Sequence, residues 1–482
     1  MAEQLRDKVA SGVAWSVAEK VGSMLLQMAV SIIVARLLMP EDFGVMAIMT
    51  FFTALALVVV DSGFSQTLIR KTAPTADDYK SVFFFNITIS LVLYAVLVAV
   101  APAVARYYGL GIISRIAPVL FLVLPLNALC VIQNTIFTRE FRFDLLSKIN
   151  FTASLVAGIA AIGLAWAGLG VWALVGQRIG VMATRAVLLW SRGKWRADGR
   201  FVSGELRAMA PFSLRLMLTD IISAVYNNIA QMFIGKMYSA SVLGYFNQAQ
   251  KLKELPVASA MQSVQSVTYP ALAKIKEDKA KFAESYRKVL MLTAFVMFPV
   301  MVGMIAVAED MFALLLGERW LPTVPYFRVL ALCGVFYPLA MIAYNVLKAG
   351  SNGTVIIRLE IAKKVIMTAI LALTIPHSAI AVAWGLVAMT AVEAFVNIVA
   401  SLRFAQVGVL ALARTLVPVA LLTAVMYAAV SAVNSVLADW SIAGRFFVAV
   451  GTGVASYILV ALSAKMEAVG ELKEIAGRFT KR

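Results

Sequence analysis

Charged side chains are scarce in this sequence of 482 residues. Asp, Glu, Lys and Arg make up 14% of it, whereas 61% of the residues are hydrophobic and the mean hydropathy is +0.87. Soluble domains carry roughly 25% charged residues, so this composition excludes an ordinary soluble fold. Apolar runs of about 20 residues recur along the chain, and each is long enough to cross the hydrocarbon core of a bilayer. We therefore predict a polytopic membrane protein.

Histidine and cysteine are also scarce. His377 is the only histidine, and Cys130 and Cys333 lie in apolar stretches without the spacing of metal ligands or of a disulfide. The sequence has no GxxxxGK[ST] phosphate loop and no GxSxG or HExxH motif. These absences argue against ATP hydrolysis, His-based catalysis and a metal site. We therefore expect no enzyme and no bound cofactor.

The apolar runs predict an all-α protein of about fourteen transmembrane helices. A spanning segment is helical because a helix satisfies its own backbone hydrogen bonds inside the bilayer. Gly168 and Gly170 leave only a very short connection between the fifth and sixth helices. The predicted spans are 12–38, 43–60, 79–101, 112–132, 146–167, 169–190, 211–237, 242–270, 286–308, 322–347, 355–375, 378–404, 409–433 and 440–463.

Basic residues are distributed unevenly between the loops on the two sides. With the N-terminus inside, the cytoplasmic segments hold 27 Lys and Arg, and the opposite loops hold only Arg36, Arg106, Lys236 and Arg319. This bias follows the positive-inside rule, so the net charge of +17 reflects topology rather than nucleic-acid binding. We expect a multi-pass protein of the bacterial inner membrane with both termini in the cytoplasm.

The chain contains an internal repeat. LLMPEDFG ends at Gly44 and MYSASVLG ends at Gly244, two hundred residues later, and Gln133-Asn134 is echoed by Tyr344-Asn345. Six spans separate corresponding points, so the two copies have the same orientation and form parallel repeats. We predict an N-terminal lobe (1–190), a cytoplasmic linker (191–210), a C-terminal lobe (211–404), an appended helix pair (405–464) and a cytoplasmic tail (465–482).

Polar residues recur at helical spacing in the first and seventh spans. The two sets are Lys20, Ser23, Gln27 and Ser31, and Asp220, Ser223, Asn227 and Gln231. Steps of three or four residues place each set on one face of its helix. An ionisable group at mid-bilayer costs at least about 2.5–3.5 kcal/mol, so such groups usually face a cavity or a partner. We interpret the sets as two walls of a central cleft, with interhelical hydrogen bonding or a Lys20–Asp220 ion pair as the alternative.

The remaining intramembrane charges give this cleft a basic character. The predicted substrate-binding residues are Lys20, Gln27, Arg178, Arg185, Asn227, Gln231, Lys251 and Lys364. Several cations together favour a diphosphate group as the ligand. Near the start of the eleventh span, snorkelling to the cytoplasmic headgroups is the alternative for Arg358, Glu360, Lys363 and Lys364. The acids Asp220, Glu254 and Glu393 are predicted to couple transport to an ion or to gate it, with structural ion pairing as the alternative.

Several motifs resemble those of one known family. They are VARLLMPEDFGVMA ending at Ala47, DSGFSQTLI beginning at Asp61, QNTIFTREFRF at 133–143, LLGERW at 315–320 and NVLKAGSNG ending at Gly353. Over roughly its first 400 residues the chain resembles the polysaccharide-transporter branch of the multidrug, oligosaccharidyl-lipid and polysaccharide (MOP) exporter superfamily. Within that branch it resembles the lipopolysaccharide or exopolysaccharide flippases of colanic-acid-type clusters.

This resemblance implies a V-shaped bundle of two six-helix lobes plus an appended pair. Its central cavity would face the cytoplasm and the periplasm in turn and carry an undecaprenyl-diphosphate-linked oligosaccharide. A Na⁺ or H⁺ gradient or the membrane potential would drive transport. Membrane lipids, a polysaccharide polymerase and chain-length machinery are the expected partners.

Other functions are kept as alternatives. A cation-coupled multidrug antiporter of the same superfamily would need an acidic chamber rather than a basic one. A membrane polymerase or glycosyltransferase would need a large extracytoplasmic loop, and no such loop here is much longer than about 18 residues. A membrane scaffold would leave the intramembrane charges without a role.

Overall fold

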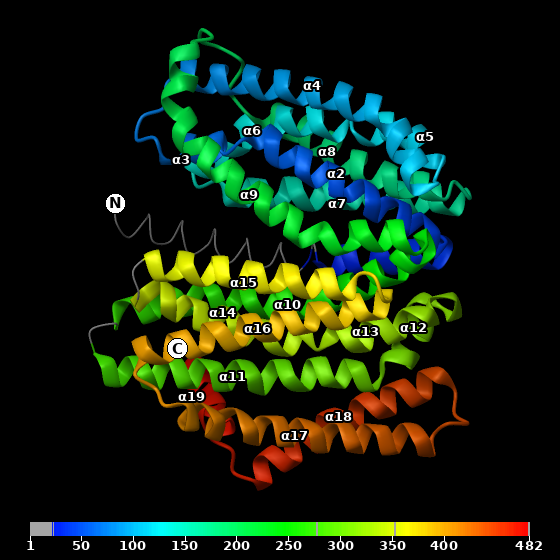
Figure 1. Cartoon of the computed structure of the whole chain (residues 1–482), viewed down its shortest axis with the longest axis vertical. Helices are drawn as coiled ribbons and strands as arrows, with labels where there is room; N and C mark the ends of the chain where they lie inside the picture. The colour runs from blue at the N-terminus through cyan, green and yellow to red at the C-terminus, as the bar shows by residue number, and fades with distance from the viewer. Residues whose placement is uncertain (1–21, 23, 276–277, 351–352, 481–482) are drawn as a thin grey trace. The chain divides into compact units, whose positions relative to one another are not determined.

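The computed structural model describes residues 22, 24–275, 278–350 and 353–480, and every regular element within these ranges is a helix (Figure 1). Contacts divide the chain into two compact units, which we describe separately: unit 1, Met1–Gly244, and unit 2, Tyr245–Arg482. The all-helical prediction is confirmed for the described residues.

Unit 1 is built from an apolar helix at Met24–Leu37, eight further helices and the first residues of α10. Within it α7 packs along α8, α2 along α9, and α4 along α6. The short connection predicted at Gly168 and Gly170 is confirmed, because both residues adopt left-handed φ angles (75° and 55°) that glycine reaches without steric penalty. The elements are Met24–Leu37, α2 (Pro40–Asp61), α3 (Phe64–Arg70), α4 (Ala76–Tyr108), α5 (Ile112–Leu120), α6 (Val123–Arg139), α7 (Phe143–Trp166), α8 (Val171–Arg192) and α9 (Ser203–Met237).

Unit 2 contains most of α10 and every later helix. Within it α14 packs along α16, α11 along α17, and α17 along α18. Its elements are α10 (Ala240–Lys274), α11 (Lys279–Ala306), α12 (Ala308–Leu316), a 3₁₀ helix (Glu318–Thr323), α13 (Val324–Ala331), α14 (Cys333–Gly350), α15 (Gly353–Thr374), α16 (Ala379–Ala405), α17 (Val409–Val436), α18 (Ile442–Ser463) and α19 (Glu467–Thr480).

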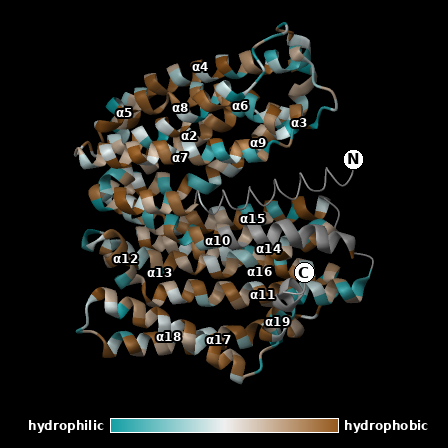
Figure 2. Cartoon of the chain, turned by 180° about the vertical axis from the view of Figure 1, so that it is seen from behind, coloured by the Kyte–Doolittle hydropathy of each residue, from teal (hydrophilic) through white to brown (hydrophobic). Residues whose placement is uncertain are grey.

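Ten stretches of the described chain are long and apolar enough to span a membrane. Figure 2 shows hydrophobic residues along the helices, with hydrophilic ones gathered at loops and helix ends. The other four predicted spans are the first, which lies partly outside the described residues, and α8, α10 and α15. These last three are continuous helices that carry charged residues within their length, which lowers their hydropathy. The count of fourteen therefore stays a prediction.

Two predicted spans are broken in the same way, which supports the internal repeat. The fourth span consists of α5 and α6, with α5 ending before Phe121. The tenth contains α13 and α14, with α13 ending before Leu332. Phe121 and Leu332 are 211 residues apart, as are Asn134 and Asn345 of the sequence echo. The break therefore recurs at the corresponding point of each copy.

The repeated glycines make reciprocal contacts inside unit 1. A Cβ on Gly44 would overlap the carbonyl oxygen of Ala240, and a Cβ on Gly244 would overlap the carbonyl oxygen of Pro40. Pro40 and Ala240 are also two hundred residues apart, so the contact follows the repeat. Only glycine lets two helix backbones approach this closely.

The predicted cytoplasmic linker is tied to unit 1 and is partly helical, because α9 already begins at Ser203. Gln133 Nε2 donates to the carbonyl oxygen of Trp195 at 2.9 Å, and Lys80 Nζ donates to that of Gly199 at 2.6 Å. The backbone N–H of Val202 donates to Ser81 Oγ at 2.8 Å. Part of the QNTIFTREFRF motif thus serves to hold the connection between α8 and α9.

Candidate functional site

One face of α9 exposes polar side chains although the helix is apolar enough to span a membrane. Asp220, Ser223 and Asn227 are exposed on this face, and Gln231, one turn further on, is half-buried and makes a contact. We call Asp220, Ser223 and Asn227 the α9 polar face. The seventh-span stripe predicted from the sequence therefore exists as a continuous surface over more than two helical turns.

The first-span stripe is described only in part. Gln27 is exposed on Met24–Leu37, and Ser31 is half-buried and makes a contact. Lys20 and Ser23 lie outside the described residues, as does the Lys20–Asp220 ion pair. The proposal that two stripes line one cleft therefore stays a prediction.

A second carboxylate lies close to Asp220. Asp61 ends α2, accepts a hydrogen bond from the Ser65 hydroxyl, and is near enough to Asp220 for the two charges to interact. The DSGFS motif creates this arrangement because Ser62 and Gly63 adopt left-handed φ angles of 49° and 69° and separate α2 from α3.

The DSGFS turn is packed tightly against α9. A Cβ on Gly63 would lie 2.7 Å from the carbonyl oxygen of Ser213, and the hydroxyls of Thr67 and Ser213 are 2.7 Å apart. Asp61 was not among the site residues predicted from the sequence. The signal that could have indicated it was an acidic residue followed by Ser-Gly within an apolar stretch.

Two guanidinium groups lie within α8. Arg178 is exposed and Arg185 is half-buried, and neither forms a salt bridge or a hydrogen bond with any other residue that the structure describes. The Nε atom of Arg185 is buried beside Cys130 without an acceptor. Seven residues separate the two arginines, so they lie on the same side of the helix about 10 Å apart. Cations left without partners at this position favour an external anion.

Unit 2 contains a buried lysine held by acids on two helices. The Lys363 side chain is 1% exposed, and its Nζ lies 2.6 Å from Glu360 Oε1, 3.1 Å from Asn397 Oδ1 and 3.6 Å from Glu393 Oε1. The Tyr344 ring centroid is 5.5 Å from the ammonium group. We call Lys363, Glu360, Glu393 and Asn397 the Lys363 cluster.

The Lys363 cluster bears on two alternatives that the sequence left open, while the coupling role of Glu393 stays a prediction. Glu393 has a structural partner, and Lys363 does not snorkel to the headgroups, because its ammonium is buried near the middle of α15. The predicted residue Lys364 is half-buried and also makes a contact. The signal for Lys363 was the Glu360-x-x-Lys363 spacing, which places opposite charges on one helix face.

Glu254 of α10 belongs to the same region of unit 2. The phenol of Tyr337 lies within electrostatic range of both Glu254 and Glu393, so the structure brings these two predicted acids near one another. The ammonium group of Lys253 on α10 is within electrostatic range of the Cys333 thiol on α14. The same thiol also contacts Thr390 of α16. Lys251 is exposed and makes a contact of its own.

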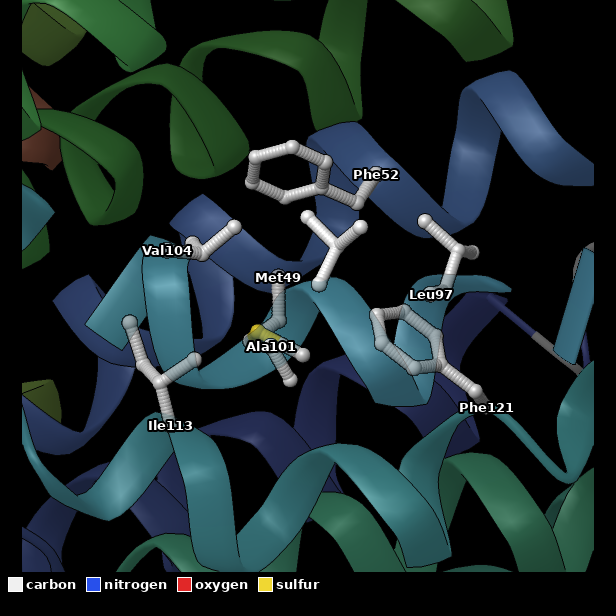
Figure 3. A pocket seen from close by; sticks show the side chains of 8 residues that line it. Met49, Phe52, Leu97, Ala101, Val104, Ile113 and Phe121 are labelled. Atoms are coloured by element: carbon white, nitrogen blue, oxygen red, sulfur yellow. The ribbon is translucent and has the colours of Figure 1, made fainter. Parts of the chain in front are cut away.

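A separate pocket in unit 1 is entirely apolar. Figure 3 shows it between side chains of α2, α4 and α5 together with Phe121. Its lining consists of Met49, Phe52, Leu97, Val100, Ala101, Val104, Ile113 and Phe121. Because none of these side chains can hydrogen-bond, the pocket cannot bind the polar part of a substrate.

Comparison with known proteins identifies the family of this chain. A family model described as "Polysaccharide biosynthesis protein" matches residues 33–325, which is more than half of the sequence. An uncharacterized membrane protein in the cps region of Klebsiella pneumoniae is 24% identical over 408 residues, covering 82% of each chain. The succinoglycan biosynthesis transport protein ExoT of Rhizobium meliloti is 23% identical over 337 residues, covering 68% of each.

Solved structures show the same fold. The lipid II flippase MurJ in an inward closed conformation superimposes with a TM-score of 0.70 at 14% identity, covering 94% of this chain and 99% of MurJ. An inward-facing multidrug resistance MATE family transporter of the MOP superfamily superimposes with a TM-score of 0.60 at 18% identity, covering 80% of this chain and 95% of that one. This chain therefore belongs to the polysaccharide biosynthesis protein family and has the fold of the MOP superfamily.

Proposed function

We propose that this chain is a flippase that carries an undecaprenyl-diphosphate-linked oligosaccharide, an O-antigen or exopolysaccharide repeat unit, across the bacterial inner membrane by alternating access. Its family, its similarity to a succinoglycan transport protein and its MurJ-like fold support a transport function rather than catalysis. The choice of substrate rests on the two guanidinium groups on α8, Arg178 and Arg185, which have no ion-pair or hydrogen-bond partner among the residues that the structure describes.

The charge and geometry of α8 suit a diphosphate. Two arginines two turns apart offer planar donors to successive phosphoryl groups, and Arg binds phosphate oxygens in a bidentate manner. The α9 polar face would contact the sugar, because each hydroxyl that lost its hydrogen bonds inside the bilayer would cost several kcal/mol. Lys20, Gln27, Gln231, Lys251 and Lys364 complete the proposed binding set, while the polyprenyl tail stays in lipid.

The proposed topology keeps fourteen spans and both termini in the cytoplasm. The two six-helix lobes (1–190 and 211–404), joined by the 191–210 linker, would rock about the substrate, with 405–464 appended and 465–482 as a tail. Asp220, Glu254 and Glu393 are the proposed coupling or gating residues, driven by a Na⁺ or H⁺ gradient or the membrane potential. A polysaccharide polymerase and chain-length machinery are the proposed partners.

A cation-coupled multidrug antiporter is the second candidate. The observation in its favour is the Asp61–Asp220 pair, because two neighbouring carboxylates can bind a cationic drug or its counter-ion. The two candidates predict opposite charge requirements. A flippase needs the guanidinium groups of α8, whereas an antiporter needs the Asp61–Asp220 carboxylates.

Alanine substitution at Arg178 and Arg185 tests the flippase. In a strain that lacks its own copy, we expect Arg178→Ala and Arg185→Ala each to reduce surface polysaccharide at least tenfold, since one charge-assisted hydrogen bond contributes about 1.5–3 kcal/mol. Surface polysaccharide is measured by glycan blotting, with protein abundance in the membrane measured in parallel.

Lys194 provides the matched control, because it is an exposed cation in the connection between α8 and α9. Lys194→Ala should leave polysaccharide unchanged. Normal polysaccharide in both arginine variants at normal abundance would contradict the diphosphate site. Drug resistance that depends on Asp61 and Asp220, without any polysaccharide defect, would favour the antiporter instead.

A further inference from the structure

The Lys363 cluster resembles a cation site whose cation is part of the protein. Two carboxylates and one amide oxygen surround the Lys363 ammonium, and the side chain that carries it is 1% exposed. These oxygens come from α15 and α16, while the Tyr344 ring on α14 faces the same ammonium. Because the ammonium already occupies the oxygens, a metal ion would have to displace it.

The charges in this cluster do not balance. Glu360 and Glu393 carry two negative charges when ionised, and Lys363 supplies one positive charge. Within the cluster the second carboxylate has no cation of its own, and between α15 and α16 the simplest way to neutralise it is to bind a proton. Glu360 holds Lys363 at 2.6 Å and Glu393 only at 3.6 Å, so Glu393 is the more weakly paired acid.

We infer that the Lys363 cluster is a proton-binding site of unit 2, in which Lys363 is the fixed cation and Glu393 binds and releases the proton. This inference rests on the proposed function for its role in transport, because there the proton would be the coupling ion. The proton moves to and from a carboxylate oxygen of Glu393, and no other bond changes.

Within the described residues, several titratable groups lie around Glu393. One is Lys253 of α10, which is within electrostatic range of Cys333, a residue that also contacts Thr390 one turn before Glu393. Glu360 and Lys363 lie on α15. Glu254 of α10 and Glu393 are both within electrostatic range of the Tyr337 phenol on α14. On α14, Tyr344 is within electrostatic range of both Glu360 and Glu393, and Lys348 lies over the Tyr344 ring. The α11 phenol of Tyr286 is bonded to Ser401, and Arg328 of α13 is paired with Glu309.

Protonation would change how three helices are held together. With Glu393 ionised, Lys363 bridges α15 and α16, and Asn397 extends the link to α14 by donating to the carbonyl oxygen of Ala340 at 3.1 Å. With Glu393 neutral, its attraction for Lys363 is lost, and Glu360 on α15 becomes the only charged partner in the cluster. Binding of a proton therefore favours a different packing of α15 against α16. Coupling requires such a link, because an ion can shift a conformational equilibrium only when it binds the two conformations with different affinities.

Infrared difference spectroscopy of the purified full-length protein tests this site without any substrate. The C=O stretching band of protonated carboxyl groups is followed from alkaline to acidic pH in the wild type and in Glu393→Gln. We expect the variant to lose one titrating band. Glu471→Gln, which changes an acid paired with Lys288 at 2.7 Å in another part of unit 2, should keep that band.

Two further variants shift the band in opposite directions if the assignment is correct. Lys363→Met removes the neighbouring positive charge, so the band assigned to Glu393 should appear at higher pH than in the wild type. Glu360→Gln removes a negative charge, so the band should titrate at lower pH. A band that is unaffected by Glu393→Gln, or that moves the same way in both variants, would overturn the inference.

Surface polysaccharide in cells separates this inference from the proposed function. Glu393→Gln should export polysaccharide poorly at normal abundance, and normal export in this variant would overturn the coupling role. If the wild type restores no polysaccharide at all, the flippase proposal fails, while the infrared titration still decides whether Glu393 binds a proton.

Discussion

At the scale of single residues, Arg139 shows how one side chain organises a loop. Its Nη1 donates to the carbonyl oxygens of Leu68, Ile69 and Lys71 at 2.6, 2.9 and 2.7 Å, and its Nη2 reaches Thr72 at 3.3 Å. One guanidinium thus satisfies the carbonyl groups at the end of α3 and in the loop after it, which would otherwise lack partners.

Arg139→Ala should destabilise unit 1 without changing its charge-dependent binding. Because hydrogen bonds to charged groups contribute about 1.5–3 kcal/mol each and several are lost together, we expect at least about 2 kcal/mol of destabilisation. The apparent melting temperature of the purified protein in detergent measures this loss. Arg196→Ala removes contacts only with nearby carbonyls, including that of Gly193 at 2.8 Å, and should change the melting temperature little. Equal melting temperatures in both variants would contradict the anchoring role.

At the scale of elements, the starts of α2 and α10 approach one another in unit 1 at the distance of a direct backbone contact. Gly44 and Gly244 each face a backbone carbonyl of the other helix, Ala240 and Pro40 respectively. No side-chain movement can relieve a clash there, because the opposing atoms belong to the backbone. The repeat therefore places glycine at both positions for the same steric reason.

Alanine at Gly44 or Gly244 should force α2 and α10 apart. We expect each variant to lose both thermal stability and polysaccharide export, and the double variant to lose little more, since one contact is broken in each case. Gly163 of α7 is the control, because a Cβ there would meet nothing within 4 Å and alanine should be tolerated. Wild-type stability in Gly44→Ala would show that the two helices are not in contact.

At the scale of the whole molecule, ion pairs fasten the C-terminal helix back onto an earlier part of unit 2. Arg287 of α11 donates to both carboxylate oxygens of Glu467 at 2.8 and 2.5 Å, across 180 residues of sequence, and Lys288 pairs with Glu471 at 2.7 Å. The Arg287 guanidinium holds the pKa of the Glu467 carboxyl, which lies outside the spanning segments, below its usual value.

This link should depend on pH with a definite sign. A carboxyl whose pKa is lowered in the folded state contributes stability above its unfolded pKa and loses it as the pH falls through the folded pKa, so α19 should be held at neutral pH and released in acid. Glu467→Gln mimics the protonated form, and we expect trypsin to cleave α19 faster in this variant at neutral pH. Arg287→Gln should have the same effect, and the double variant should add little. Full additivity of the two substitutions would argue against a direct interaction.

The sequence alone was sufficient for the class of fold and the repeat. Long apolar runs can be read directly from the residue types along the chain. The repeat is visible at Gly44 and Gly244 because a direct backbone contact permits only glycine at both positions. The division between compact units could not be predicted. The longest polar loop suggested a boundary at 191–210, which stays a prediction, whereas the contacts place the division after Gly244, since α9 packs on α2, α3 and α4.

The candidate site was predictable only in outline. Helical periodicity placed Asp220, Ser223 and Asn227 on one face, because their relative positions depend on a single helix. Periodicity could not choose Lys363 over Lys364, because that choice depends on where Glu393 and Asn397 of another helix lie. Periodicity also could not predict that Asp61 lies near Asp220, because the left-handed turn at Ser62 and Gly63 sets the distance between them.

The sequence by itself was sufficient to indicate an α-helical protein with many apolar helices, a repeated glycine motif and charges within apolar runs, because these properties depend on residue type and spacing along the chain. Only the tertiary structure decided which charges are paired. Charged residues are scarce in this sequence. Each charged side chain within an apolar helix must therefore either pair with a residue on another helix or remain available for a substrate. Lys363 has such partners, and Arg178 and Arg185 have none among the residues described.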